Sequence, residues 1–305
     1  MNVKKALIVC LFWMILCVSL AATNQTTVAV RGEADRTMSQ QDVRTGFIEV
    51  NDGKLFYEEA GEGEIIVMIH DGILHRVTWD AQFEALAEEY RVVRYDRRGY
   101  GDSSKAEAQY SDIADLEMVF AQLNIREAIV MGMSYGGSLA IDFTLANPDR
   151  VTKIVLVGSI VSGYGYSEHM WNRGGHLTKE TWASPEALRR YFFEKDPYTV
   201  WVENKEARAK GLRMVEKYPH NMDMERYKLL QGPKRPALGR LDEIKVPTLI
   251  VVGEYDIPDV HAHAGVIETG IAGSKRVIVN NAGHHVPTEQ PEILNELILK
   301  FVRGK

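Results

Sequence analysis

The sequence predicts an α/β fold, in which helices flank a mostly parallel β-sheet and a helical segment is inserted between two strands. Short apolar runs alternate with segments of helical periodicity from residue 65 to residue 158, which is typical of βαβ units. The alternation stops near Gly163, gives way to a charged, aromatic stretch, and resumes at the apolar run 247–253. We therefore expect a core of residues 45–163 and 241–305 and a helical cap of residues 164–240.

The first elements of this core are a hairpin and two buried strands. Residues 47–50 and 55–57 flank Asn51-Asp52-Gly53, a turn signal between two short strands. Residues 65–69 are continuously apolar, as in a strand that is buried on both faces of a parallel sheet. Residues 79–90 have helical spacing, and residues 91–95 are the next strand.

The remaining elements follow the same alternation. The predicted helices are residues 111–123, 136–146 and about 290–302. The predicted strands are residues 126–132, 151–158, 247–253 and 275–280.

Length and charge restrict the class of function. A chain of 305 residues can bury a sizeable core as one large domain with an insertion. The net charge of −6 gives no electrostatic reason to expect nucleic acid as a partner. The expected partner is a small-molecule substrate, and the oligomeric state is not determined by the sequence.

The amino terminus predicts a secretory signal peptide over residues 1–22. Lys4 and Lys5 precede the apolar run 6–18, and small residues suited to cleavage follow, so that the cut would fall after Ala21 or Ala22. Residues 23–44 would then form a flexible leader. Export to the periplasm or the medium follows, with no stable membrane association after cleavage. An uncleaved membrane anchor is the alternative.

Both cysteines of the chain, Cys10 and Cys17, lie inside this segment. Neither follows a small residue, as the cysteine of a lipoprotein would. The mature protein would contain no cysteine and would depend on its core rather than on disulfides.

The stretch Gly132-Met133-Ser134-Tyr135-Gly136 carries the strongest functional signal. It follows the apolar run 128–131 and precedes a predicted helix, which is the context of a G-x-S-x-G nucleophile elbow. A Cβ at either outer glycine would crowd the turn, and Ser134 is expected in an unfavourable backbone region. The pattern predicts that Ser134 is a nucleophile.

A serine nucleophile needs a base that is oriented by an acid. His284 lies in the loop between the last strand and the last helix, and Asp256 lies just past a strand end. The order Ser134, Asp256, His284 is nucleophile, acid, histidine. His285 could replace His284, and Asp259 could compete with Asp256.

With these residues the chain resembles the α/β-hydrolase family over residues 46–160 and 245–303. Residues 69–72 are similar to the family's oxyanion-loop motif, and residues 95–103 are similar to its D-x-R-G-x-G-x-S segment. Residues 283–291 are similar to its histidine loop. The resemblance implies the hydrolase fold and a triad of Ser134, Asp256 and His284.

The resemblance also implies that the backbone amides of Gly72 and Tyr135 form the oxyanion hole. Loss of one such donor costs about 3–4 kcal/mol. Asp71 departs from the family, because it replaces a glycine, and its charge about 6 Å from an oxyanion would oppose it by roughly 3 kcal/mol. We expect Asp71 to turn away or to pair with Arg76, with the Ile73 amide as the fallback donor.

Other polar residues of these segments have structural interpretations. His70 is expected to brace the oxyanion loop, and Asp96 is expected to be structural. His261 and His263, together with the two histidines near residue 284, could suggest a metal site, but carboxylate or cysteine company is lacking. We predict no metal and no cofactor.

The cap is rich in aromatic side chains, and some of them should line a pocket over Ser134. We name Ile73, Trp171 and His285 as candidate pocket residues, and an ordinary cap core is the alternative role for each aromatic residue. The cap aromatics considered are Trp171, Trp182, Tyr191, Phe192, Phe193, Tyr198 and Trp201.

The sequence therefore predicts an exported serine hydrolase that cleaves a small ester, lactone or related acyl substrate through an acyl-enzyme. A serine at the elbow disfavours haloalkane dehalogenase and epoxide hydrolase chemistry, because the family members with those activities carry aspartate at this position. Tyr135 disfavours proline iminopeptidases, which usually carry tryptophan. A C–C bond hydrolase acting on a diketone ring-cleavage product, a cofactor-free perhydrolase and a ligand receptor remain as alternatives.

Overall fold

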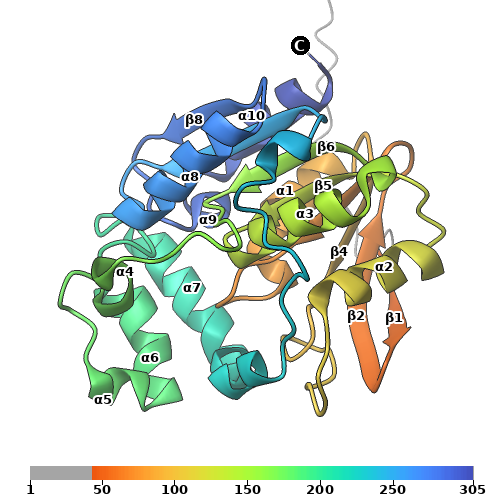
Figure 1. Cartoon of the computed structure of the whole chain (residues 1–305). Helices are drawn as coiled ribbons and strands as arrows, with labels where there is room; N and C mark the ends of the chain where they lie inside the picture. Colours follow the sequence, from red (N-terminus) through yellow and green to blue (C-terminus); the bar gives the residue numbers. More distant parts are fainter. Residues whose placement is uncertain (1–42, 305) are drawn as a thin grey trace, which may run out of the picture. The chain divides into compact units, whose positions relative to one another are not determined.

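The computed structural model describes residues 43–304, so the predicted signal peptide and most of the predicted leader lie outside the described residues. Within residues 43–304 the strands form one eight-stranded sheet in the order β1-β2-β4-β3-β5-β6-β7-β8 (Figure 1). The strands are β1 (Arg44–Val50), β2 (Gly53–Ala60), β3 (Ile65–Ile69), β4 (Arg91–Tyr95), β5 (Ala128–Met133), β6 (Val151–Val157), β7 (Thr248–Gly253) and β8 (Lys275–Val279).

The sheet is mostly parallel, as the sequence predicted. Strand β2 pairs antiparallel with β1 and with β4, and every other pair is parallel. The predicted hairpin is confirmed, because Val50 pairs with Gly53 and Asp52 has a φ of 60° between them. The hairpin thus supplies the antiparallel edge of a parallel sheet.

Helices cover both faces of the sheet (Figure 1). One core cluster joins the strands to α2, α3 and α8 and includes Phe120, Phe143 and Ile267; the other joins them to α1 and α10 and includes Phe83 and Leu294. Each fully buried apolar side chain of this size contributes about 1.5–3 kcal/mol. The covering helices are α1 (Asp80–Leu86), α2 (Asp112–Gln122), α3 (Tyr135–Ala146), α8 (Pro258–Gly270), α9 (Val286–Glu289) and α10 (Pro291–Val302).

Two helices differ from the sequence prediction. The segment predicted as a helix over residues 79–90 is a 3₁₀ turn, Arg76–Trp79, followed by the shorter α1. Helix α8 was not predicted, because its apolar residues do not form the simple stripe that a surface helix shows. The Ser111 side chain caps α2 by accepting from the Ala114 amide.

Residues 164–240 are mainly helical, as predicted. Side chains of Ser167, Thr178, Ser184 and Asn204 each accept a backbone amide at a helix start. In Figure 1 helices α4 to α7 gather at the lower left, away from β1 and β2. The segment contains α4 (Glu168–Asn172), α5 (Lys179–Trp182), α6 (Pro185–Arg190), a π-helical turn (Tyr191–Lys195), α7 (Lys205–Lys217) and two 3₁₀ turns (Pro219–Met222 and Met224–Lys228).

The sheet topology marks one edge for a site. Strand β3 lies between β4 and β5, and its last residue, Ile69, pairs with Gly132 near the end of β5. In parallel sheets ligands bind beyond the carboxyl ends of the strands where successive connections diverge in direction. The loops after β3, β5, β7 and β8 all leave this edge. Across residues 43–304 we find no helix of the length and apolarity needed to span a bilayer.

Candidate active site

Ser134 stands at a sharp turn between β5 and α3. Its φ of 53° and ψ of −117° lie in a region that costs a non-glycine residue about 1–3 kcal/mol, as the elbow pattern predicted. A Cβ at Gly132 would collide with the Gly136 carbonyl, and a Cβ at Gly136 would collide with the Ile69 carbonyl. The two glycines therefore let α3 start directly against β3 and keep the strained turn closed.

Asp256 and His284 lie in the loops that follow β7 and β8. The Nδ1 atom of His284 is 2.9 Å from Oδ2 of Asp256 and 3.0 Å from Oδ1. A carboxylate accepts, so Nδ1 carries the proton and Nε2 is left as the basic nitrogen. Burial lowers the pKa of His284, but the charge and hydrogen bond of Asp256 outweigh it and hold that pKa above its usual value.

The structure brings this pair close to the elbow. The Ser134 amide donates to the Val157 carbonyl at 2.8 Å. A Cβ on the next residue, Gly158, would lie 3.0 Å from the Nδ1 and Cε1 atoms of His284. One β6 terminus thus contacts both the serine turn and the histidine ring.

Glu289 holds the histidine loop in place. Its carboxylate accepts from the Gly283 amide at 3.0 and 3.1 Å and from the Trp201 amide at 2.6 Å. Burial raises the pKa of Glu289 to about 7, although these hydrogen bonds oppose the shift. The His284 amide itself donates to the Tyr198 carbonyl at 2.8 Å, so the loop is fixed from the cap side as well.

The two predicted oxyanion donors are neighbours. A Cβ at Gly72 would lie 3.9 Å from the Cβ of Tyr135. Within residues 43–304 neither the Gly72 amide nor the Tyr135 amide donates to another protein group. Both amides remain available for an oxygen of a bound substrate.

His70 and Arg97 fix the peptide that carries the Gly72 amide. The Asp71 carbonyl accepts from His70 Nδ1 at 2.8 Å and from Arg97 Nη2 at 2.8 Å, while His70 Nε2 accepts from the Arg97 amide at 2.9 Å. Burial, then the Arg97 charge, holds the pKa of His70 well below its usual value, so the ring stays neutral. The interpretation of His70 as a brace is confirmed.

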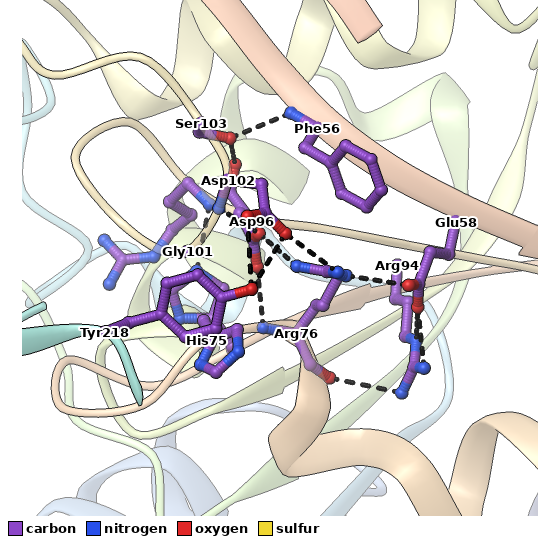
Figure 2. Close-up of polar contacts among 12 residues, drawn as sticks. Phe56, Glu58, His75, Arg76, Arg94, Asp96, Gly101, Asp102, Ser103 and Tyr218 are labelled. Atoms are coloured by element: carbon purple, nitrogen blue, oxygen red, sulfur yellow. Dashed lines mark hydrogen bonds and ion pairs between the residues drawn. The ribbon is translucent and has the colours of Figure 1, made fainter. Parts of the chain in front are cut away.

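Of the two alternatives expected for Asp71, turning away or pairing with Arg76, the pairing is wrong. The Asp71 side chain turns back on its own loop, where Oδ1 accepts from the amides of Ile73 at 2.6 Å and Leu74 at 2.8 Å. The Ile73 amide is therefore occupied, and Ile73 is no fallback oxyanion donor. Figure 2 shows Arg76 among three other carboxylates, which are Asp96 at 2.5 Å, Glu58 at 3.0 Å and Asp102 at 3.1 Å.

Asp96 lies at the centre of this cluster and is structural, as predicted. It is fully buried and accepts from the backbone amides of Arg76 and Asp102, each at 2.9 Å. Burial raises the pKa of Asp96 to about 6 against the opposing charge of Arg76. The cluster connects the turn after β3 with the turn after β4 (Figure 2).

A cavity of about 480 Å³ adjoins the elbow. Three of the seven cap aromatics considered, Trp171, Trp182 and Phe192, line it, which confirms that the cap contributes aromatic residues to the pocket. The full lining is Tyr135, Ile160, Tyr166, Met170, Trp171, Arg173, Trp182, Phe192, Met224 and Tyr227.

The other cap aromatics have structural roles. Tyr191 and Phe193 belong to the core cluster of the cap, Tyr198 bonds His169 at 3.0 Å, and Trp201 stacks on Tyr255 at 5.5 Å. The other two pocket candidates also lie elsewhere. Ile73 packs against the cap core, and His285 is fully buried against Phe193.

Arg173 is a pocket residue that sequence reasoning missed. It has a φ of 51° and pairs with the buried Asp196 at 2.5 Å. Among the described residues, the one hydrogen-bond partner of its Nη1 is the Met170 sulfur, at 3.7 Å. The lining is thus apolar apart from tyrosine hydroxyls and this one guanidinium.

A family model described as "Alpha/beta hydrolase family" matches residues 66–297 of the chain. The chain belongs to the alpha/beta hydrolase family. The resemblance seen in the motifs is therefore confirmed, and the protein is a hydrolase.

Relatives and solved structures agree with this assignment. Proteins of Klebsiella pneumoniae subsp. pneumoniae and Pseudomonas putida, both named as 2-hydroxy-6-oxononadienedioate/2-hydroxy-6-oxononatrienedioate hydrolases, are each 32% identical to this chain. The matches cover 84% and 86% of this chain, respectively, and 94% of each relative. A thermophilic esterase from Thermogutta terrifontis superposes with a TM-score of 0.72 at 22% identity, over 86% of this chain and 98% of the esterase. The enol-lactonase of Burkholderia xenovorans LB400 gives 0.69 at 20% identity, over 85% of this chain and all of the lactonase.

The hydrolase structure separates the predicted residues from their rivals. Asp259 accepts from the Ser167 amide at 2.7 Å and from its hydroxyl at 2.8 Å, so it is engaged away from His284. His263 is buried and its Nδ1 accepts from the Val161 amide at 3.0 Å. Among residues 43–304 no group of three or more His, Cys, Asp or Glu side chains could hold a metal ion.

Proposed function

We propose that this hydrolase cleaves a small ester, lactone or related acyl substrate with Ser134 as nucleophile, His284 as base and Asp256 as the residue that orients the base. The observation that carries the proposal is the His284–Asp256 pair beside a strained serine turn. This arrangement of nucleophile, base and orienting acid is recognised by geometry and roles.

The proposed reaction has two steps. Ser134 Oγ attacks the carbonyl carbon while His284 Nε2 takes its proton, and the Gly72 and Tyr135 amides stabilise the oxyanion. Collapse breaks the bond to the leaving group, which takes the proton from His284. Water then attacks the acyl-enzyme by the same route, releasing the acid and restoring Ser134.

The pocket favours an apolar or aromatic acyl group. Its lining is mainly aromatic and aliphatic, with Arg173 as the one charged side chain. Burial of apolar surface gives roughly 25 cal/mol per Å², so an acyl chain in this cavity would supply most of the binding energy.

The test is a substrate panel with the purified mature protein. Sustained hydrolysis of p-nitrophenyl esters or lactones, at a rate that depends on the size of the acyl group, supports the proposal. A single slow turnover with a ligand-dependent thermal shift would instead support a ligand receptor. Peroxyacid formation from a carboxylic acid and hydrogen peroxide would support a perhydrolase.

A second candidate is hydrolysis of a C–C bond in a diketone ring-cleavage product. The two relatives named above favour it, because their names give that class of substrate. The same serine can attack a ketone carbonyl, and the leaving group is then a carbon rather than an oxygen. Loss of the absorbance of a 2-hydroxy-6-oxo-dienoate, together with slow ester turnover, would move the assignment to this reaction.

We also propose that the protein is exported after cleavage near Ala21 or Ala22. The support is the sequence of residues 1–22, which lie outside the described residues. Expression with its own leader in a bacterium should give a protein outside the cytoplasm that begins at Ala22 or Thr23. An intact amino terminus in the membrane fraction would favour an anchor.

A further inference from the structure

We propose that Tyr227 is a positioning residue that sets the orientation of the Gly72 loop through Tyr100. Tyr227 belongs to the returning segment of the cap, and Tyr100 belongs to the turn after β4. The inference rests on the proposed function, because it concerns the oxyanion donors of that reaction. It adds a link by which the cap controls the catalytic loop.

Two hydrogen bonds form the link. The Tyr100 hydroxyl donates to the Gly72 carbonyl at 3.0 Å, and the Tyr100 and Tyr227 hydroxyl oxygens are 2.9 Å apart. A carbonyl can only accept, so the single hydrogen of Tyr100 goes to Gly72. Tyr227 must therefore donate to Tyr100, and both hydroxyls have a defined direction.

Tyr227 also lies close to the candidate site. A Cβ placed on Gly72 would lie 3.2 Å from the Tyr227 hydroxyl oxygen, which is tighter than ordinary van der Waals contact. The rings of Tyr227 and Tyr135 lie edge to face, with centroids 6.3 Å apart. Tyr227 thus lies beside the residues of both proposed oxyanion donors, and with Tyr135 it lines the cavity described above.

The segment that carries Tyr227 is anchored independently of its hydroxyl. Arg226 Nη1 donates to the Gly99 carbonyl at 2.5 Å, and the Asn221 side-chain oxygen accepts from the Gly101 amide at 2.9 Å. The Arg226 guanidinium also lies 3.9 Å from the centroid of the Tyr100 ring. Removal of one hydroxyl should therefore leave the segment docked.

The hydroxyl of Tyr227 keeps its proton. Burial and the neighbouring Tyr100 raise the pKa of Tyr227 well above its usual value, although Arg97 and Arg226 oppose the shift. The donor is therefore present throughout the range in which a histidine base works. Its loss would leave the Tyr100 hydroxyl, which holds the Gly72 carbonyl, without its own donor. The Gly72 loop would then be less firmly oriented, and a small misplacement of its amide costs rate rather than ground-state binding.

The experiment compares Tyr227→Phe, Tyr100→Phe and their double variant with a matched control. The control is Tyr218→Phe, in the same part of the cap. The hydroxyl that it removes bonds only the exposed Asp102 carboxylate, at 3.1 Å (Figure 2). We measure kcat and KM on a p-nitrophenyl ester, inhibition by a trifluoromethyl ketone, and the melting temperature. The ketone forms a tetrahedral adduct with an oxyanion and so reports on the donors themselves.

We expect kcat to fall about tenfold or more in both single variants, with KM changed less than threefold and the melting temperature nearly unchanged. The double variant should be no slower than the slower single variant, because both changes break one link. The trifluoromethyl ketone should bind more weakly by the same factor as kcat falls. Tyr218→Phe should behave as the unmodified enzyme in all these measurements.

Unchanged kcat in Tyr227→Phe, or losses that multiply in the double variant, would overturn the inference. Should Tyr227→Phe fail to fold, Tyr100→Phe tests the same link to Gly72. Labelling of the unmodified enzyme by a fluorophosphonate separates failure of this inference from failure of the proposed function. Labelled Ser134 with normal Tyr227→Phe kinetics rejects only the link, and an unlabelled Ser134 rejects the function.

Discussion

At the scale of single residues, hydrogen-bond partners determine which polar atoms of the candidate site donate and which accept. The Asp256 carboxylate fixes which nitrogen of His284 carries a proton, and the neutral His70 fixes the carbonyl of Asp71. Asp71 satisfies two amides with Oδ1, while its Oδ2 is buried without a partner. An unpaired buried carboxylate oxygen acts on its surroundings through charge.

The first prediction concerns this charge. Asp71 is one of the groups that raise the pKa of His284, after Asp256. In the proposed reaction His284 must be neutral to act as the base, so kcat/KM should rise with pH through that pKa. Asp71→Asn keeps the Oδ1 acceptor and removes the charge, and should therefore move the rising limb to lower pH while changing the plateau by less than about tenfold.

A pH profile of kcat/KM checks this prediction. Asp52→Asn, in the exposed turn of the β1–β2 hairpin, is the control and should leave the limb in place. A limb that moves to higher pH in Asp71→Asn would show that the carboxylate does not act on His284 in this way.

At the scale of elements, the cap contributes two kinds of aromatic side chain. Trp171 is 57% exposed and lines the cavity, whereas Phe193 is 2% exposed and belongs to the core of the cap. The Phe193 ring packs directly against Gly211 of α7, where a Cβ would collide with it. Helical periodicity predicts neither role, because both residues lie in short elements.

The second prediction uses these residues as a pair. Trp171→Ala should change the preference among acyl groups by about 1–3 kcal/mol, because the lost contacts differ between substrates. Its cost in unfolding free energy should be within about 1 kcal/mol. Phe193→Ala should instead cost about 3–5 kcal/mol of stability. Ester panels and urea unfolding of both variants measure the two effects, and an equal loss on every ester with a large loss of stability in Trp171→Ala would contradict the assignment.

The strand ends explain which parts of the site could be predicted from the sequence. Ser134, Asp256 and His284 each follow a strand with a recognisable apolar run, so local patterns located them. Helix α8 and the Asp71 contacts were not predictable in this way. Asp71 lost Arg76 to Asp96, Glu58 and Asp102, and these carboxylates come from β2 and from the turn after β4. Which carboxylates pair with Arg76 depends on the packed fold and cannot be read from the local sequence.

At the scale of the whole molecule, contacts between the cap and the core hold the loops of the candidate site. The carboxylate of Glu289 joins the histidine loop to the Trp201 amide, and Tyr227 joins the cap to the Gly72 loop. Arg173, Tyr227 and the clamping role of Glu289 escaped sequence reasoning because each has a partner far away in the sequence: Asp196, Tyr100 and Trp201, respectively. The hydrolase scaffold was predictable, whereas these contacts between its cap and its core were not.

The third prediction concerns stability and pH. The folded-state pKa of Glu289, about 7, is above the unfolded value of 4.5, so the folded state binds the proton more tightly. This stabilisation is fully present below pH 4.5 and is lost as pH rises to about 7. Glu289→Gln cannot titrate and should flatten the curve by up to about 3 kcal/mol between pH 5 and pH 8.

Urea unfolding of the unmodified enzyme and Glu289→Gln at several pH values measures this difference. Asp52→Asn, in the exposed turn of the β1–β2 hairpin, is the control and should follow the unmodified enzyme. Parallel curves for Glu289→Gln and the unmodified enzyme would mean that the carboxyl does not titrate with the fold.

The central proposal is that Ser134 is the nucleophile, and active-site labelling tests it most directly. A fluorophosphonate should add to the mature protein once, and peptide mass spectrometry should place the adduct on Ser134. Ser134→Ala should fold normally, take up no label and lose several orders of magnitude in kcat, because the three residues act as a unit. An adduct on another serine, or near-normal hydrolysis by Ser134→Ala, would contradict the proposal.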